Sequence, residues 1–182
     1  MSRKAAEPIV IDGRHGERAT LCLSPGMSVA IIGLDGTGKS TASEMLEKTL
    51  IEAGVPTRSF HWYRAHQTCF MVPLAVLGNR WTRKSVQIFD RSIFDNIAVW
   101  LQRVRNVALR QRLMWWAAKM AQTVYPRFDA IIHLTAAPEV IGERRPAMTA
   151  QEIALGREVY ASLSEVLRTR PLDTVSIRRG DA

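Results

Sequence analysis

Residues 27–41, MSVAIIGLDGTGKST, constrain the fold of this chain more than any other stretch. An apolar run leads into a glycine-rich loop, which a lysine, a serine and a threonine follow. The spacing from Gly33 to Ser40 meets the pattern G-x-x-x-x-G-K-[ST] in full. The stretch therefore predicts a strand, a phosphate-binding loop and the first turn of a helix.

A phosphate chain needs many hydrogen-bond donors that no side chain obstructs. Gly33, Gly36 and Gly38 can expose backbone N–H groups in a concave loop, and the following helix presents its positive end. Lys39 adds a mobile charge for the outer phosphates, and the Ser40 hydroxyl can bind Mg²⁺. This combination predicts binding of a nucleoside triphosphate such as ATP. The predicted nucleotide-binding residues are Gly33, Leu34, Asp35, Gly36, Thr37, Gly38, Lys39, Ser40 and Thr41.

Composition favours one domain. With 182 residues, of which 47% are hydrophobic, the chain can bury one sizeable core. The net charge of +8 suits contact with phosphates, but also with nucleic acid or an anionic membrane surface. No run of five basic residues occurs, which disfavours a polybasic tail. We therefore expect a single domain over residues 1–182 and no specific nucleic-acid partner.

Targeting and membrane-spanning segments are not expected. The first residues are basic, but no apolar core of a signal peptide follows them. The longest apolar stretch, residues 69–78, is too short to span a bilayer. Cys22 and Cys69 lack the spacing of a metal site, and we expect buried thiols. These features predict a cytoplasmic protein without a membrane span, and a homodimer stays open.

The rest of the chain alternates strands and helices. Two short β-like runs within residues 8–23 predict a hairpin, as an N-terminal extension over residues 1–25. Residues 65–82 are irregular or helical. The alternation predicts a three-layer α/β/α fold with a five-stranded, mainly parallel sheet that binds ligands at the carboxyl ends of its strands. Further strands are predicted at 57–63, within 84–92, at 129–135 and at 173–177, and helices at 39–53, 93–104, 107–124, 138–144 and 149–170.

Aromatic residues in two of these elements allow a structural or a binding role. Trp115 and Trp116 could stack a nucleic-acid base, but their helix is so apolar that we interpret them as core residues. His133 alternates with apolar residues along a predicted strand, which is typical of a core histidine.

A second group of polar residues follows another predicted strand. Asp90 and Arg91 end the strand within 84–92, so they are expected at the same sheet edge as the phosphate loop. There Asp90 can hold Mg²⁺, directly or through water, and Arg91 can grip a second phosphate or an anionic acceptor. The alternative is a strand-end turn with a surface ion pair. Asp35 adds a carboxylate inside the loop, which either faces a second substrate or stabilises the loop.

These motifs together resemble the thymidylate kinase-like branch of the P-loop kinases. The resemblance rests on GLDGTGKST after a strand, FDRS at the end of a later strand, HLTAAPEVIGERR, and REVY in a late helix, and it covers most of residues 27–170. It implies that the loop binds ATP, that Arg91 contacts the acceptor phosphate and that Asp35 lies near the acceptor sugar. The segment after P-E-V corresponds to a lid, whose Arg144 and Arg145 would reach the transferred phosphate.

The chain departs from true thymidylate kinases in three places. It has HWYRAHQ where R-E-P-G is usual, Ser92 where an aromatic residue is usual, and a short lid. The D-R-S sequence is closer to deoxynucleoside kinases. The acceptor is therefore expected to be a nucleoside monophosphate or, alternatively, a nucleoside, a sugar or another small molecule. Arg64, after the second predicted strand, is a further acceptor-binding candidate.

The predicted activity is transfer of the ATP γ-phosphoryl group to a small acceptor, with Mg²⁺ held by Ser40 and Asp90. The candidate catalytic residues are Asp35, Lys39, Arg91, Arg144 and Arg145, and the candidate acceptor-binding residues are Asp35, Arg64, Asp90 and Arg91. One alternative is a regulatory protein that hydrolyses ATP without an acceptor, and another is nucleic-acid binding by the basic surface. Two strands before a phosphate loop also occur in transporter ATPases, but this chain has no LSGGQ-type signature.

Overall fold

The computed structural model describes residues 8–12, 18–61, 71–124, 127–167, 171–172 and 176–179. The strands are β1 (Pro8–Asp12), β2 (Arg18–Cys22), β3 (Ser28–Ile32), β4 (Thr57–Phe60), β5 (Val86–Phe89), β6 (Ala130–Leu134), β7 (Pro171–Leu172) and β8 (Ser176–Arg179). The helices are α1 (Lys39–Glu52), α2 (Val72–Thr82), α3 (Ile93–Leu101), α4 (Val107–Val124), α5 (Pro138–Arg144) and α6 (Ala150–Leu167).

The main sheet is parallel and has the order β4-β5-β3-β6-β7. Strand β3 lies at its centre and is buried along its whole length. Because all the strands point the same way, the residues that follow β3, β4, β5 and β6 gather at one edge of the sheet. The phosphate loop follows β3, and Asp90 follows β5, so the predicted sharing of one edge is confirmed.

The predicted strand at 173–177 does not join the main sheet: residues 173–175 lie outside the described residues, and residues 176 and 177 belong to a strand of another sheet. Among the described residues, only the two-residue β7 extends the main sheet beyond β6, so the sheet has four strands of four or five residues where five were predicted. Pro171 has no N–H group to donate to a ladder, which confines it to a sheet edge. Residues Ser176–Arg179 form β8, which pairs antiparallel with β1 in a separate sheet of order β2-β1-β8. The predicted N-terminal hairpin is confirmed as the antiparallel pair β1 and β2.

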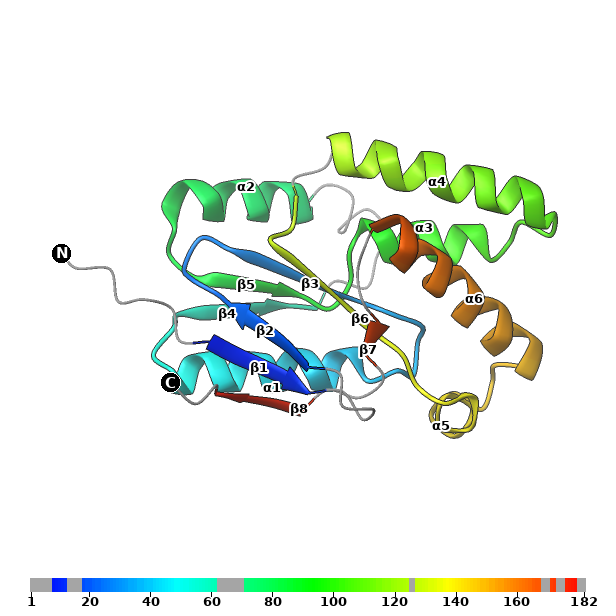
Figure 1. Ribbon diagram of the computed structural model, residues 1–182. Coiled ribbons are helices and arrows are strands. Elements are labelled where there is room, and N and C mark those ends of the chain that lie inside the picture. Colours follow the sequence, from blue (N-terminus) through cyan, green and yellow to red (C-terminus); the bar gives the residue numbers. More distant parts are fainter. Residues whose placement is uncertain are drawn as a thin grey trace.

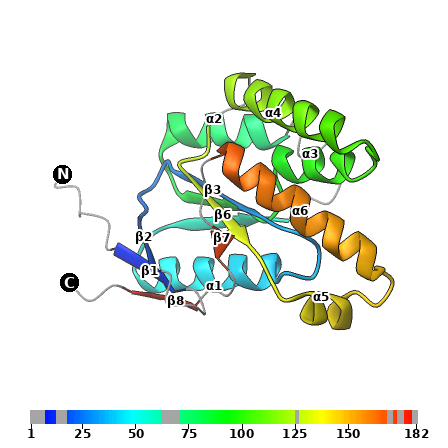
Figure 2. The ribbon, with the colours of Figure 1, turned by 45° about the vertical axis from the view of Figure 1, so that its right-hand side comes forward.

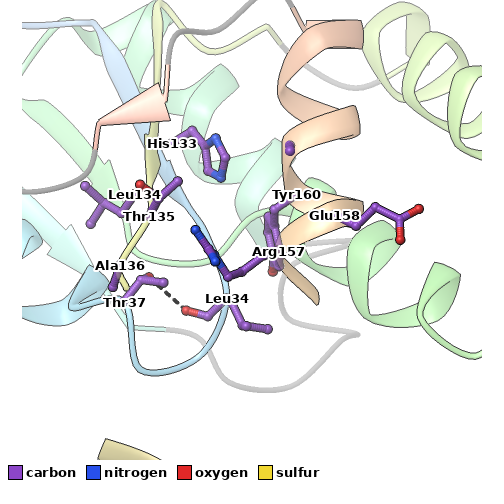
Figure 3. Close-up of a pocket in the computed structure, with 10 residues that line it drawn as sticks. Leu34, Thr37, His133, Leu134, Thr135, Ala136, Arg157, Glu158 and Tyr160 are labelled. Atoms are coloured by element: carbon purple, nitrogen blue, oxygen red, sulfur yellow. Dashed lines mark hydrogen bonds between the residues drawn. The ribbon is translucent and has the colours of Figure 1, made fainter. Parts of the chain in front are cut away.

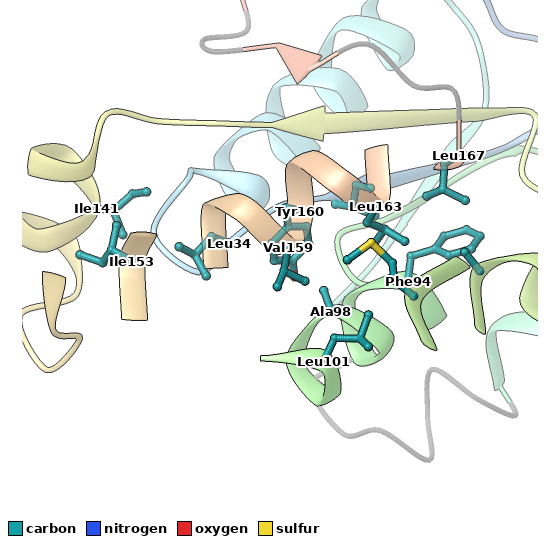
Figure 4. Packing of buried hydrophobic residues seen from close by; sticks show 13 residues of the cluster. Leu34, Phe94, Ala98, Leu101, Ile141, Ile153, Val159, Tyr160, Leu163 and Leu167 are labelled. Atoms are coloured by element: carbon teal, nitrogen blue, oxygen red, sulfur yellow. The ribbon is translucent and has the colours of Figure 1, made fainter. Parts of the chain in front are cut away.

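Helices cover both faces of the main sheet (Figures 1 and 2). One face packs on α1 through a core cluster that includes Leu46 and Leu50 of the helix and Ile31 of β3. The other face packs on α3, α4 and α6, whose buried side chains meet in a second cluster (Figure 4). A smaller cluster joins Val72 and Val76 of α2 to Phe89 of β5. This three-layer arrangement confirms the predicted layers.

The predicted helix 107–124 has the expected bounds, but its buried side is different. Arg110, Met114 and Ala118 face the core, whereas Trp115 and Trp116 are 58% and 59% exposed. The interpretation of the tryptophans as core residues is therefore wrong. A narrow stripe of one residue per turn suffices to pack α4 on the helices beneath it, which leaves its large apolar side chains outside. Cys22 is likewise exposed, and Cys69 lies outside the described residues.

Two other predictions concern the ends of elements. Helix α3 ends at Leu101 rather than at residue 104, and β4 ends at Phe60 rather than at residue 63. Glu152 and Thr149 form the predicted capping box before α6, with Thr149 N donating to Glu152 Oε2 at 2.7 Å.

Over the described part of the chain, no helix is both long and apolar enough to cross a membrane.

Candidate phosphate-binding site

The phosphate loop takes backbone conformations that favour glycine. Gly36 and Gly38 have φ angles of 93° and 92°, and Gly38 is the residue before α1. A Cβ atom on Gly33 would lie 2.4 Å from the Leu134 carbonyl oxygen, so β6 closes on the loop from behind. Thr37 Oγ1 donates to the Leu34 carbonyl at 2.8 Å across the loop. The loop is therefore held from within and from β6, with the amino end of α1 beneath it.

Lys39, the first residue of α1, folds back over this loop. Its Nζ atom donates to the carbonyl oxygens of Gly33 at 2.6 Å and Leu34 at 3.2 Å, and the side chain is only 8% exposed. It also lies 3.4 Å from Asp35 Oδ1. The ammonium group thus stands inside the loop, where a bound anion could compete for its protons.

Asp35 connects the phosphate loop to Arg91, which follows β5. Arg91 Nη2 donates to Asp35 Oδ1 at 3.0 Å, so one carboxylate oxygen contacts both Arg91 and Lys39. Burial alone would raise the pKa of Asp35, but the charges of Lys39, Arg91 and Arg145 outweigh it and lower that pKa. Asp35 therefore stays ionised, and it lies beside Arg91.

Asp90 lies at the end of β5 and is 2% exposed. Ser40 Oγ donates to Asp90 Oδ2 at 3.2 Å, which joins the start of α1 to the end of β5. Asp90 Oδ1 is buried and has no hydrogen-bond partner among the described residues. A carboxylate oxygen with unused lone pairs beside an exposed hydroxyl is the donor type that Mg²⁺ prefers. The residues therefore fit Mg²⁺, which usually takes one or two protein ligands together with phosphates and water.

His61 is a member of this group that the sequence analysis did not identify. It follows β4, and its Nδ1 atom lies 2.8 Å from Asp90 Oδ2. The parallel order of β4 and β5 was the signal that could have found it, because both strands end at the same edge. Asp90 thus contacts side chains from two other elements, α1 and the end of β4. The predicted acceptor-binding residue Arg64 lies outside the described residues.

The two arginines of the predicted lid lie over the loop. Arg144 Nη1 donates to the Gly36 carbonyl oxygen at 3.0 Å, and a Cβ atom on Gly36 would lie 3.2 Å from Arg145 Cγ. Both arginines are exposed. Helix α5 therefore brings both cations to the loop, where Arg145 adds to the charge that keeps Asp35 ionised.

A buried hydrogen-bond network fixes the start of α3 directly after Asp90 and Arg91. Ser92 caps the helix, and Asp95 Oδ2 accepts from the Ser92 backbone N–H at 2.9 Å. Tyr160 of α6 donates to Asp95 Oδ1 at 3.0 Å. The S-x-x-D spacing from Ser92 to Asp95 is a capping-box pattern that was available in the sequence. The network therefore connects α6, which follows Arg144 and Arg145 in the chain, to the start of α3 directly after Asp90.

A cavity of about 340 Å³ lies between the back of the loop, the end of β6 and α6 (Figure 3). Leu34 and Thr37 border it from the loop, and Tyr160 borders it from α6. His133 is 2% exposed and stacks on Tyr160 with ring centroids 6.1 Å apart, in agreement with its interpretation as a core histidine. Ser40, His61 and Asp90 are not among the residues that line it.

No protein-family model matches the chain, and no curated protein matches it. Among solved structures, it is similar to deoxyadenosine kinase from M. mycoides with bound dATP, with a TM-score of 0.51 and 17% identity over 81% of this chain and 90% of that chain. A structure of deoxyadenosine kinase from M. mycoides with the products dCMP and a flexible dCDP bound gives a TM-score of 0.49 and 18% identity over the same shares. At this level of identity the first similarity shows the fold: the chain shares the fold of a deoxyadenosine kinase.

Proposed function

We propose that this protein is an ATP-dependent phosphotransferase that moves the γ-phosphoryl group to a small acceptor. One observation carries the proposal: Asp90 and Arg91, at the end of β5, contact Ser40 and Asp35 of the phosphate loop region at 3.2 Å and 3.0 Å. Arg91 lies beside Asp35, a carboxylate of the phosphate loop. An arginine there, beside a carboxylate of the loop, is suited to a second substrate.

In this proposal the loop amides and Lys39 hold the β- and γ-phosphates. Lys39 Nζ would exchange its bonds with the Gly33 and Leu34 carbonyl oxygens for bonds to phosphate oxygens, which are charged and therefore stronger acceptors. Ser40 and Asp90 would hold Mg²⁺, which neutralises charge on the β- and γ-phosphates when it is bound.

The arginines neutralise charge on the acceptor side. An oxygen of the acceptor attacks the γ-phosphorus, the bond to the bridging oxygen breaks, and ADP leaves with the electron pair. Arg91 would bind the acceptor, together with Arg64, and Asp35 would orient both Arg91 and the acceptor. Arg144 and Arg145 would face the group in transfer. Such a site acts by positioning and by charge, without a covalent enzyme intermediate.

The resemblance to thymidylate kinases favours a nucleoside monophosphate as the acceptor, because Arg91 would then meet a phosphate. A nucleoside is the second candidate. Two observations favour it: the D-R-S sequence that ends in Ser92, and the fold shared with a kinase named for deoxyadenosine. These two acceptors differ in charge, so the size of the Arg91 contribution to acceptor binding distinguishes them.

The test is a screen for ADP release from MgATP with nucleoside monophosphates, nucleosides and sugars as acceptors. Lys39→Ala serves as the blank, since it removes the ammonium group from the loop. Release that rises at least roughly tenfold with one acceptor class, and is lost in Lys39→Ala, is the expected result. Release that is the same with every acceptor and with none would favour a regulatory ATPase instead.

A further inference from the structure

The outer side of α2 carries large apolar side chains that are mostly exposed. Leu74 is 66% exposed, Leu77 is 54% exposed and Trp81 is 91% exposed. Their spacing of three and four residues places them on one side of the helix, opposite to the buried Val72 and Val76. A tryptophan that leaves nine-tenths of its surface in water is costly unless something else covers it.

The outer sides of α3 and α4 continue this pattern. Trp100 of α3 is 48% exposed, and α4 adds Trp115, Trp116 and Met120, which is 44% exposed. Helices α2 and α4 lie next to one another along the same border of the molecule in both views (Figures 1 and 2). We use the name tryptophan face for the exposed apolar side chains of these three helices. They are Leu74, Leu77, Trp81, Trp100, Trp115, Trp116 and Met120.

The exposed charges of residues 71–124 are all positive, and next to this segment Glu158 of α6, which is 53% exposed, pairs with the buried Arg110 of α4 at 2.6 Å. Residues 71–124 contain two carboxylates, Asp90 and Asp95, and both are buried. Asp129, just beyond this segment, lies 3.5 Å from Arg80 and accepts a bond from the Ser28 backbone N–H. The exposed cations of the segment are Arg80, Arg83, Lys84, Arg103, Arg105, Arg112 and Lys119.

We propose that the tryptophan face docks on the surface of an anionic lipid bilayer. Tryptophan rings are favoured at the headgroup level, leucine and methionine side chains reach the first part of the acyl region, and lysine and arginine pair with anionic headgroups. The exposed charges have the sign that such a surface attracts. None of the described helices can cross a membrane, and in this proposal α2, α3 and α4 lie on the bilayer surface.

Two other occupants fit the face less well. A second copy of this chain would bring two positive faces together, with no exposed carboxylate from residues 71–124 to offset the repulsion. A nucleic acid would match the charge and could stack on tryptophans. It would leave Leu74, Leu77 and Met120 without a role, because aliphatic side chains offer bases neither stacking nor hydrogen bonds.

The test is co-sedimentation of the full chain with vesicles of phosphatidylcholine containing about 30% phosphatidylserine, against phosphatidylcholine alone, at about 0.15 M salt. Lys84→Gln should lower the affinity for the anionic vesicles about fivefold, because one basic residue near such a surface contributes about that factor to binding. Lys48→Gln on α1, at the opposite side of the sheet, is the matched control and should bind like the wild type. Leu77→Ala should lower binding by at least about fivefold, whereas Ile51→Ala on α1, which is 56% exposed, should not.

Each of the following results would overturn the proposal. The protein sediments equally with both kinds of vesicle or with neither, or the α1 variants lose as much binding as Lys84→Gln and Leu77→Ala. Salt-dependent binding to RNA without vesicle binding would assign the face to nucleic acid. A dimer that Leu77→Ala dissociates in light scattering, again without vesicle binding, would assign it to a second copy of the chain.

Discussion

Ser40 Oγ lies 3.2 Å from Asp90 Oδ2, which joins the first turn of α1 to the end of β5 across the open edge of the sheet. The two residues are fifty positions apart in the chain, and only the parallel pairing of β3 with β5 brings them together. The contact leaves Asp90 Oδ1 without a partner among the described residues. The Ser40 hydroxyl and the Asp90 carboxylate together are suited to bind a metal ion that also contacts a phosphate chain.

Asp90→Asn tests this relationship. The variant keeps the shape of the side chain but loses its charge, so the apparent affinity for Mg²⁺ should fall at least roughly tenfold. Turnover measured as a function of Mg²⁺ concentration gives that affinity. Asp129→Asn is the matched control, because this carboxylate lies just before β6, at the other edge of the same sheet, and it should leave the Mg²⁺ dependence unchanged. Equal Mg²⁺ curves for Asp90→Asn and the wild type would remove Asp90 from the metal site.

Arg91→Ala tests the acceptor side. If Arg91 stabilises charge on the acceptor and on the group in transfer, kcat/KM for the acceptor should fall by about 10³. Arg91→Lys should recover only part of this loss, because a lysine keeps the charge but cannot form two parallel bonds. The KM for ATP should change little. An acceptor kcat/KM that stays at the wild-type value in Arg91→Ala would contradict the assignment.

Tyr160→Phe tests the buried network behind the site. The variant leaves Asp95 without one of its donors in a buried position, which should cost about 1–3 kcal/mol of unfolding free energy. For a domain of this size, each kcal/mol corresponds to a fall in Tm of about 2–4 °C. Thermal unfolding measured by circular dichroism gives the value.

The loss of unfolding free energy in Tyr160→Phe should depend on pH. Burial raises the pKa of Asp95, and the Tyr160 hydrogen bond opposes this rise. A carboxyl group with a raised folded pKa stabilises the fold most below its ordinary pKa of about 4, and this contribution falls as the pH rises toward the folded pKa. Without the Tyr160 hydroxyl that pKa rises further, so the cost of Tyr160→Phe should be larger at neutral pH than at about pH 4. A cost that does not change with pH, or that changes equally in an Asp95→Asn background, would contradict this account.

Gly156→Ala tests the packing of α6 on the phosphate loop. A Cβ atom at this position would lie 2.6 Å from Leu34 Cδ1, so the loop residue must shift. Overpacking of this kind costs about 1–3 kcal/mol, which exceeds the gain of about 1 kcal/mol from helix propensity. Gly78→Ala in α2 is the matched control, because nothing lies within 4 Å of its added Cβ atom, and it should stabilise the protein. A Tm that rises in both variants would show that Leu34 moves freely.

The sequence predicted the features that depend on local spacing. The glycine pattern, the strand ending in Asp90 and the capping box at Thr149 each involve a few neighbouring residues, and the structure contains all three. The shared edge followed from the alternation of strands and helices. The ion pair of Asp35 with Arg91 across that edge was not predicted.

The features that could not be predicted from the sequence depend on tertiary packing. His61 meets Asp90 only because β4 pairs with β5, and nothing next to His61 in the chain marks it as a site residue. The buried side of α4 contains Arg110, which pairs with Glu158 of α6 at 2.6 Å, so hydrophobic periodicity favoured the wrong side of that helix. The last predicted strand was placed in the wrong sheet, because β8 pairs with β1, from the other end of the chain.

The most direct test of the proposed function follows the γ-phosphate itself. The protein is incubated with Mg²⁺ and ATP labelled at the γ-phosphate, together with the acceptor that gives the largest ADP release, and the labelled products are separated. The account predicts that the label appears on the acceptor in amounts equal to the ADP formed, and that Lys39→Ala forms neither product. Label found only as inorganic phosphate, with the acceptor unlabelled, would contradict it.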